Sequence, residues 1–276
     1  MQLQETAYAK INLALHVRKR RDDGYHELET LFAFAADGDL LSAEPENDLS
    51  LLITGPFAQG LESDESNLVL RAARALQAST GSEPGASITL DKRLPIASGI
   101  GGGSADAAAA LRLLSNLWHI NLSDEKMLAI AAGLGADVPA CLRSNTVYGS
   151  GVGEQLTVYD GGHDITGIPV LLVNPLKPCP TGPVFRAWDG VDRGAFDPQD
   201  WRTARNDLED PAKALVPEIS DALALLRAQT DANLVRMSGS GATCFGLFET
   251  PSARDDAAQA IKASEPGWWV LPTVLR

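Results

Sequence analysis

Residues 94–106, with the sequence LPIASGIGGGSAD, place four glycines within five positions, at Gly99 and at Gly101 to Gly103. Glycine has no Cβ, so its backbone adopts positive φ angles and its N–H groups approach a ligand closely. The alanine- and leucine-rich run that follows, Ala107 to Trp118, has the composition and apolar spacing of a helix. A helix N-terminus presents unpaired N–H groups and the positive end of its dipole, which favour an anion. The segment therefore indicates a loop that binds phosphate groups.

The glycine-rich segment also has a purely structural interpretation. It can be a connection in which Ser104 caps the helix and Asp106 lies in the first turn, since both residue types are common there. Two other phosphate motifs fit poorly. The chain has no Gly-Lys pair, which excludes a Walker loop. A dinucleotide fingerprint also fails, because Ser104 and Asp106 stand where its third glycine is required.

Three polar side chains stand out elsewhere in the chain. In the strand predicted for Gln2 to Val17, apolar residues alternate along one face, and Lys10 and Asn12 share the other. Asp137 follows a predicted helix in the sequence GADVP, where its neighbours are small and apolar. Taken alone, the lysine is typical of a solvated strand edge, and the aspartate is as typical of a helix or turn cap as of a catalytic base.

The composition is that of a globular chain with an acidic surface. The 276 residues are 45% hydrophobic and 21% charged, which suffices for a full core and favours two closely packed lobes over one domain. The formal net charge of −13 argues against nucleic acid or an anionic membrane as a partner. A phosphorylated ligand must then be held by local devices, such as backbone N–H groups, a few basic side chains and a divalent cation.

The cysteines and the N-terminus bear on the compartment. Cys141, Cys179 and Cys244 are odd in number and widely separated, so neither a disulfide framework nor a zinc site is indicated. They are expected to be buried thiols in a reducing compartment. Neither a signal peptide nor an apolar run of membrane-spanning length is present. We therefore expect a cytoplasmic protein.

The chemistry-bearing segments must be positioned by a mixture of strands and helices. Strands are predicted at 2–17, 25–34, 51–54, 88–90, 155–159, 169–174, 244–248 and 268–274. Helices are predicted at 67–76, 107–118, 123–134, 217–228 and 252–263. Residues 181–183 (TGP) are expected to form a turn, and 189–199 a long surface loop. Strands and helices thus interleave in both halves of the chain.

Three separated segments resemble one family pattern. They are residues 9–12 (AKIN), the loop and helix start at 95–108, and residues 238–242 (SGSGA). In order and separation they are similar to the three motifs of the GHMP superfamily, which includes galactokinase, homoserine kinase, mevalonate kinase and phosphomevalonate kinase. Residues 23–28 (DGYHEL), 99–104 (GIGGGS), 135–139 (GADVP) and 206–209 (NDLE) narrow the resemblance to the 4-diphosphocytidyl-2-C-methyl-D-erythritol kinase family. The resemblance covers nearly the whole chain.

The resemblance implies an α+β fold in two lobes. An N-terminal lobe, residues 1–157, would carry the ATP loop, and a ferredoxin-like C-terminal lobe would comprise residues 158–276, with the active site between them. The family transfers the γ-phosphoryl group of ATP to the 2-hydroxyl of a cytidine-diphosphate-linked methylerythritol, in the non-mevalonate route to isoprenoid precursors. ATP is thus the expected co-substrate and Mg²⁺ the expected cation, with unassigned metal ligands. The expected assembly is a monomer or weak homodimer.

The resemblance also implies which residues handle ATP and the transferred group. Asp137 matches the family's catalytic base, and Lys10 matches the lysine expected to pair with it. The residues that match the ATP site are Asn67 and Lys92 near the adenine, together with Pro95, Gly99, Gly101, Gly102, Gly103 and Ser104 around the phosphates. Ala105 and Ile100 depart from the family pattern, which often has Ser and Leu there.

Five further residues match the substrate site of the family. Tyr25 and Phe185 match the aromatic pair that sandwiches the cytosine, and His26 matches the residue at its edge. Asn12 is within reach of substrate, and Thr181 is close to the substrate phosphates. Without the resemblance, these aromatic residues would be interpreted as packing and the histidine as structural. The alternative functions are another GHMP small-molecule kinase, a non-catalytic nucleotide-binding protein, or an oxidoreductase that uses the loop for NAD.

Overall fold

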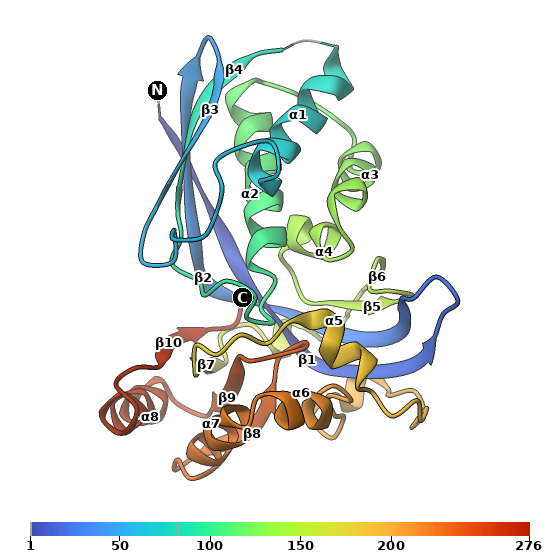
Figure 1. The fold of residues 1–276 in the computed structure, drawn as a ribbon, viewed down its shortest axis with the longest axis vertical. Helices are drawn as coiled ribbons and strands as arrows, with labels where there is room; N and C mark the ends of the chain where they lie inside the picture. The colour runs from blue at the N-terminus through green and yellow to red at the C-terminus, as the bar shows by residue number, and fades with distance from the viewer. Residues whose placement is uncertain (1, 82) are drawn as a thin grey trace. The chain divides into compact units, whose positions relative to one another are not determined.

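The computed structural model describes residues 2–81 and 83–276 and has the α+β fold that the sequence predicts (Figure 1). The chain forms two compact units, each built from non-consecutive segments. Unit 1 comprises Met1–Ala9, Asp37–Ile96 and Gly101–Ser144; unit 2 comprises Lys10–Ala36, Ala97–Ile100 and Asn145–Arg276. These units are built from non-consecutive segments and do not test the predicted division of the chain after residue 157, which stays a prediction.

Unit 1 contains a sheet whose strands come from the first third of the chain. The strands are β1 (Leu3–Arg20), β2 (His26–Glu46), β3 (Leu49–Thr54) and β4 (Gly85–Asp91). Two of them are divided between the units: β1 belongs to unit 1 up to Ala9, and β2 belongs to it from Asp37 onward. β4 pairs antiparallel with β2 and parallel with β3. Ala86, Ile88 and Leu90 alternate with less buried residues along β4, so one face of this strand packs into the core.

Four helices complete unit 1 and lie on one side of β3 and β4 (Figure 1). They are α1 (Leu68–Thr80), α2 (Gly102–Leu117), α3 (Asp124–Leu134) and α4 (Val138–Arg143). The alanines of α2 are buried almost completely, which lets neighbouring helices approach closely. The helix starts at Gly102, earlier than the predicted Ala107, because the glycines themselves adopt helical geometry.

Unit 2 contains the ferredoxin-like arrangement that the family resemblance implies. Its elements are β7 (Pro169–Asn174), α7 (Glu218–Arg227), β8 (Ala232–Met237), β9 (Cys244–Phe248), α8 (Pro251–Ser264) and β10 (Trp269–Val274). The strands form an antiparallel sheet in the order β10-β7-β9-β8. This βαββαβ succession, with the first strand beside the last, is the ferredoxin-like topology. Its core contains Ile219, Leu223 and Leu226 of α7 and Ile261 of α8.

The remaining elements of unit 2 are short. β5 (Val147–Ser150) pairs with the first part of β2 and with β6 (Gln155–Val158). The 3₁₀ turns are Gly162–Asp164 and Pro198–Asp200, and the helices are α5 (Thr181–Arg186) and α6 (Glu209–Leu215). The predicted turn at 181–183 is therefore wrong: it is the first turn of α5, where Pro183 fits because no intrahelical N–H is needed.

Two strand predictions also need correction. The alternation in β1 predicts one buried and one solvated face. In the structure residues 9–17 are all buried, so the Lys10 and Asn12 side chains are buried as well. The strand predicted to end at Phe34 continues to Glu46 as β2. The first error arises because alternation describes a sheet with one solvated face and not a strand covered on both sides.

The three cysteines are free and buried, as predicted. Burial raises the pKa of the Cys179 and Cys244 thiols, so both are inert at neutral pH. Within residues 2–81 and 83–276, no helix has the length and apolar character needed to span a membrane.

Candidate functional site

Three sequence motifs meet within unit 2. The Ser238 hydroxyl accepts a hydrogen bond from the Asn12 backbone N–H at 3.1 Å and donates one to the Gly99 carbonyl at 2.9 Å. The Thr243 N–H donates to the Ser98 carbonyl at 3.1 Å. One serine side chain thus joins β1, the start of the glycine-rich loop and the turn between β8 and β9. The order of the motifs in the sequence does not reveal this convergence, but the fold does.

Glycines are required where the loop and the turn touch. Gly99 has a φ of +77°, and a Cβ there would lie 2.6 Å from the Ser238 carbonyl oxygen and 2.7 Å from that of Gly241. Gly239 has a φ of +55°, and its Cβ would lie 2.8 Å from the Gly99 carbonyl oxygen. Backbone therefore packs directly on backbone at this point, which explains two of the glycines that the sequence singles out.

Gly99→Ala is expected to lower the free energy of unfolding by at least about 2 kcal/mol, because it combines left-handed strain with a backbone clash. Urea denaturation measures the change. Gly133→Ala is the matched control, since Gly133 lies in α3 with nothing within 4 Å of its added Cβ, and alanine there should stabilise the helix by up to about 1 kcal/mol. Equal stabilities for the two variants would contradict the packing argument.

The NDLE segment fixes the same turn from another side. The Asn206 side-chain amide donates to the Met237 and Gly239 carbonyls, each at 2.8 Å. The Asp207 carboxylate accepts from the Val17 N–H at 2.9 Å. Asn206 Oδ1 accepts from the Leu208 N–H, immediately before α6. This motif therefore positions β1 and the turn, and it also forms the segment that leads into α6.

Lys10 is held by a chain of buried polar contacts in unit 2. Its ammonium donates to Asn12 Oδ1 at 3.0 Å and lies 5.0 Å from the centre of the Phe32 ring. The Asn12 amide donates to the Thr30 hydroxyl at 2.7 Å, which donates to the Ala14 carbonyl at 2.7 Å. These contacts fix the rotamers of both Lys10 and Asn12, as expected for side chains that must be preorganised.

An aromatic group surrounds His26 in unit 2. Its ring lies 5.0 Å from that of Phe185, tilted by 41°, and 5.8 Å from that of Trp188, edge-on at 82°. Arg20 Nε donates to His26 Nε2 at 3.2 Å. Burial and the Arg20 charge both lower the pKa of His26. Tyr25 follows a tight turn and is 62% exposed, so its ring is accessible from solvent.

Thr181 begins α5 and lies against the glycine turn. Its hydroxyl is 3.0 Å from the Ser240 hydroxyl. The Cys179 thiol donates to the Ser240 carbonyl at 3.1 Å. The structure thereby brings Thr181 to the same turn that contacts Asn12 and Gly99.

Unit 1 contains the helix N-terminus that the sequence predicts as an anion site. Gly101 is the N-cap of α2 with a φ of 64°, and no side chain caps it. The proposal that Ser104 is the N-cap is therefore wrong: Gly102, Gly103 and Ser104 form the first turn. This 16-residue helix begins without a side-chain cap on its N–H groups, which is an arrangement that can accept a phosphate. Pro95 is buried just before the loop.

Lys92 lies in a buried cage of two carboxylates. Its ammonium is 2.5 Å from Asp39 Oδ2 and 2.6 Å from Asp106 Oδ2, and its side chain is 3% exposed. Asp39 Oδ1 also accepts the N–H groups of Arg93 and Leu94, at 2.6 and 2.7 Å. A Cβ on residue 102 would lie 3.1 Å from the Lys92 ammonium, so the cage supports the first turn of α2.

The cage holds one more negative group than positive. Burial disfavours the charged Lys92, but the two carboxylates outweigh it and raise its pKa. Burial also raises the pKa of Asp106 to about 7, despite the attraction of Lys92. Among the described residues, Asp106 Oδ1 is buried without a hydrogen-bond partner. A side-chain contact between Lys92 and adenine would require this lysine to leave the cage, so its role at the adenine stays a prediction.

Asp137 and Asn67 both precede helices of unit 1. Asn67 is the N-cap of α1 and accepts the Val69 N–H at 2.9 Å. Asp137 occupies the N-cap position of α4, but its carboxylate makes no capping hydrogen bond, so capping does not account for it. Asp137 belongs to unit 1 and Lys10 to unit 2. Their pairing therefore stays a prediction.

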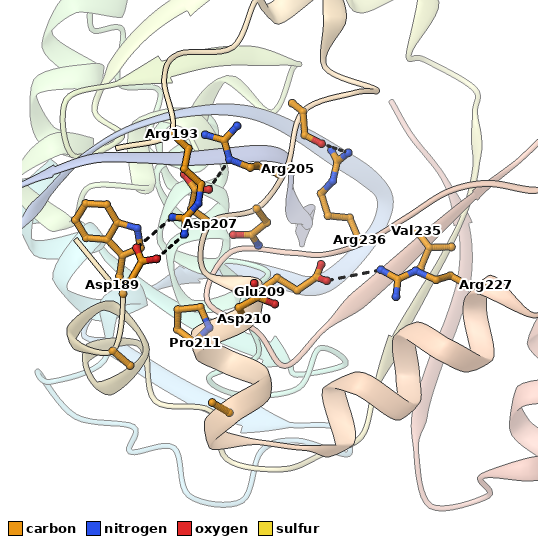
Figure 2. A pocket seen from close by; sticks show the side chains of 15 residues that line it. Asp189, Arg193, Arg205, Asp207, Glu209, Asp210, Pro211, Arg227, Val235 and Arg236 are labelled. Atoms are coloured by element: carbon orange, nitrogen blue, oxygen red, sulfur yellow. Dashed lines mark hydrogen bonds and ion pairs between the residues drawn. The ribbon is translucent and has the colours of Figure 1, made fainter. Parts of the chain in front are cut away.

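A polar cavity of about 540 Å³ lies beside α6 and β8 in unit 2 (Figure 2). Arg236 is buried near it and donates to the Trp201 carbonyl at 3.3 Å, and burial lowers its pKa to about 10. Three other arginines are each paired with a carboxylate, as the dashed lines in Figure 2 show: Arg193 with Asp189, Arg205 with Asp207, and Arg227 with Glu209. The acidic and basic side chains that line this cavity are equal in number, which favours a structural role for these arginines over the binding of a charged ligand.

Sequence reasoning missed three of these residues. Asp39, Arg20 and Trp188 carry no motif. The available signal for Asp39 was a carboxylate immediately before the apolar pair Leu40 and Leu41 in a strand, which marks a buried charge that needs a partner. Arg20 offered only its place in a basic run, which is usually solvated.

Two family profiles match the chain. The GHMP kinases N terminal domain matches residues 67–145, and the GHMP kinases C terminal profile matches residues 193–266. A 4-diphosphocytidyl-2-C-methyl-D-erythritol kinase of Rhizorhabdus wittichii is 55% identical, over 99% of this chain and 94% of its own. The chain belongs to this kinase family. A kinase of the same name from Sphingopyxis alaskensis is 51% identical over 99% of both chains.

Solved structures agree with membership of the 4-diphosphocytidyl-2-C-methyl-D-erythritol kinase family. A crystal structure of 4-(cytidine 5'-diphospho)-2C-methyl-D-erythritol kinase has a TM-score of 0.83 and 35% identity, and the match covers 99% of each chain. A homoserine kinase from Cytophaga hutchinsonii has a TM-score of 0.72 at 17% identity, covering 99% of this chain and 95% of that one, and shares the fold. As a GHMP kinase, this family member uses ATP and a small-molecule acceptor.

Proposed function

We propose that this chain transfers the γ-phosphoryl group of ATP to the 2-hydroxyl of 4-diphosphocytidyl-2-C-methyl-D-erythritol. The observation that carries the proposal is the 55% identity, over nearly the full length, with a kinase named for that substrate. The geometry of each unit agrees with it. Unit 1 supplies an uncapped helix N-terminus, and unit 2 supplies an aromatic group with a neutral histidine.

The phosphates of ATP are proposed to bind at the start of α2. Gly101, Gly102 and Gly103 expose N–H groups that donate to phosphate oxygens, and the helix dipole favours their charge. Mg²⁺ is the proposed counter-ion of these phosphates, and Ser104, in the first turn of α2, is the residue whose hydroxyl would help to hold it. Such a cation would supply positive charge against the phosphates.

Asp137 is proposed to accept the proton of the attacking hydroxyl. This alcohol is tertiary and weakly acidic, so an ordinary carboxylate does not deprotonate it in advance. A loose transition state removes that need, because the hydroxyl proton is lost late, as the new bond forms. Lys10, held by Asn12, is proposed to keep Asp137 ionised and to offset charge on the transferred group.

The cytosine is proposed to lie between Tyr25 and Phe185, with its edge at His26. The exposed Tyr25 ring and the Phe185 ring beside His26 provide apolar faces in one part of unit 2. The Thr181 and Ser240 hydroxyls are 3.0 Å apart, so one donates to the other and the second keeps its O–H for the substrate diphosphate. The acceptor is thus recognised at its base, away from the reacting hydroxyl.

Tyr25→Ala and Phe185→Ala are each expected to raise KM for the cytidylyl substrate by about 5- to 150-fold, because one base–aromatic stack is worth roughly 1–3 kcal/mol. Steady-state kinetics at saturating ATP measure this. Val158→Ala is the control, since it removes another exposed apolar side chain of unit 2, and its KM should not change. An unchanged KM in both aromatic variants would refute the sandwich.

The decisive experiment measures ADP release from ATP and Mg²⁺ with four separate acceptors. These are 4-diphosphocytidyl-2-C-methyl-D-erythritol, mevalonate, homoserine and galactose. Turnover with the first alone is the expected result. Turnover with another acceptor would keep the superfamily and discard the substrate. No turnover with any would favour a nucleotide-binding protein without catalysis.

A further inference from the structure

Arg20 lies at the end of β1, where one guanidinium contacts two separate segments of unit 2. Its Nε donates to His26 Nε2 at 3.2 Å, and its Nη2 donates to the Arg186 carbonyl at 3.3 Å. Arg186 is the last residue of α5 and follows Phe185 directly. Arg20 therefore ties the hairpin that carries His26 to the helix that carries Phe185.

The Arg20 contact determines where the His26 proton lies. A guanidinium has donors only and remains charged, so the nitrogen that faces it must offer a lone pair. His26 Nε2 is then unprotonated, and a neutral ring carries its proton on Nδ1. The doubly protonated ring is incompatible with this contact, because both of its nitrogens are donors. The tautomer is assigned from the hydrogen-bond network. The lowered pKa of His26 agrees with a neutral ring.

The Nδ1 proton is available to a ligand. The contacts of His26 within the described residues are the Arg20 bond at Nε2 and the rings of Phe185 and Trp188. The ring is therefore restrained by two aromatic neighbours and by a hydrogen bond at its Nε2 atom. A fixed imidazole ring thus presents one N–H donor beside the aromatic faces.

We propose that Arg20 is a positioning residue that holds His26 as the neutral Nδ1–H tautomer and thereby makes the site select cytosine over uracil. This inference rests on the proposed function, because it takes the base of the substrate to be read by His26. Cytosine presents an unprotonated N3, which accepts from the Nδ1–H. Uracil carries a proton on N3, so the same histidine would place donor against donor.

The alternative tautomer would reverse this preference. With the proton on Nε2, the Nδ1 lone pair would face the lone pair of cytosine N3 but would accept from the N3–H of uracil. When two donors or two lone pairs face each other in a desolvated contact, both groups stay unpaired, and this cost discriminates strongly against the wrong base. Arg20 therefore affects specificity without contacting the base.

The first arm of the test is nitrogen-15 NMR of His26 in the ligand-free protein. Long-range correlations to the ring protons report which nitrogen carries the proton. The wild type should show Nδ1–H. Arg20→Glu should show Nε2–H, because a carboxylate accepts from Nε2. Arg20→Met removes the donor without adding an acceptor and should give a mixture. The matched control, Lys19→Glu, makes the same charge change at the neighbouring exposed residue and should leave Nδ1–H.

The second arm compares kcat/KM for the cytidylyl substrate and its uridylyl counterpart. The ratio should be at least about 100 in the wild type and in Lys19→Glu, and should fall by at least about tenfold in Arg20→Glu. A ratio that stays constant although the tautomer switches would overturn the selectivity argument. Retention of Nδ1–H in Arg20→Glu would overturn the positioning role.

The two arms separate this inference from the proposed function. If the wild type phosphorylates neither nucleotide substrate, the proposed function fails and the selectivity argument fails with it. The NMR arm needs no substrate, so it decides the effect of Arg20 on His26 in either case.

Discussion

Lys92→Met is expected to lower the free energy of unfolding by about 3–5 kcal/mol, the largest stability effect that the fold indicates. The variant keeps an apolar stem of similar length but leaves Asp39 and Asp106 buried without a cation. Asp39 retains two backbone N–H donors, whereas Asp106 loses the one hydrogen-bond donor that the structure gives it. Removing one partner of a buried ion pair is costly because the other charge stays desolvated.

Urea denaturation at pH 8, followed by far-UV circular dichroism, measures the loss in Lys92→Met. Arg93→Met is the matched control, since Arg93 is the next residue and its pair with Asp91 is half exposed. That control should change stability by at most about 1 kcal/mol. Equal unfolding midpoints for the two variants would show that the cage does not hold unit 1 together.

The Asp106 pKa adds a dependence on pH to this result. Its ordinary value is 3.8, and burial raises it to about 7 in the folded protein. Between these values the folded state binds a proton that the unfolded state has lost, so stability falls as pH rises through this interval. Asp106→Asn removes the titrating group. The wild type should therefore lose stability relative to Asp106→Asn from about pH 4 to pH 7, and a constant difference would contradict the raised pKa.

Asp137→Asn is expected to lower kcat by about 10²- to 10⁴-fold with little change in ATP binding, because the amide keeps the shape but cannot accept the proton. Pre-steady-state and steady-state ADP release give kcat, and calorimetric titration gives the affinity for ATP. A loss in kcat with intact affinity is the signature of a group used in the transition state.

The control for Asp137→Asn is Asp124→Asn, which removes an exposed carboxylate from the first turn of α3 in the same unit. Its kcat should match the wild type. Full activity of Asp137→Asn would remove Asp137 from the mechanism and leave positioning and electrostatics to account for catalysis. A parallel loss of ATP binding would indicate a structural role instead.

Local features of the fold were predictable from the sequence. The glycine loop and α2 follow from residues adjacent in the chain, and the alternation of β4 follows from a single buried face. The start of α2 was misplaced because Gly101 caps the helix through its backbone conformation, whereas Ser104 has the more familiar capping side chain. Helix boundaries depend on such φ values, which side-chain preferences do not encode.

Long-range features were not predictable. Lys92 and Asp39 are 53 residues apart, and nothing in their spacing pairs them. The Ser238 contact with Asn12 spans 226 residues. In the site, the family resemblance named the aromatic and glycine positions, but the Arg20 contact arises only when β1, β2 and α5 are assembled. Such pairings depend on tertiary geometry, which local sequence patterns do not describe.

The bridge between Ala35 and Leu275 joins one of the earliest strands to the penultimate residue of the chain. Contacts between residues this far apart in the sequence cost more loop-closure entropy than local contacts do. This bridge should therefore form late in folding, after the helices and hairpins whose contacts are local.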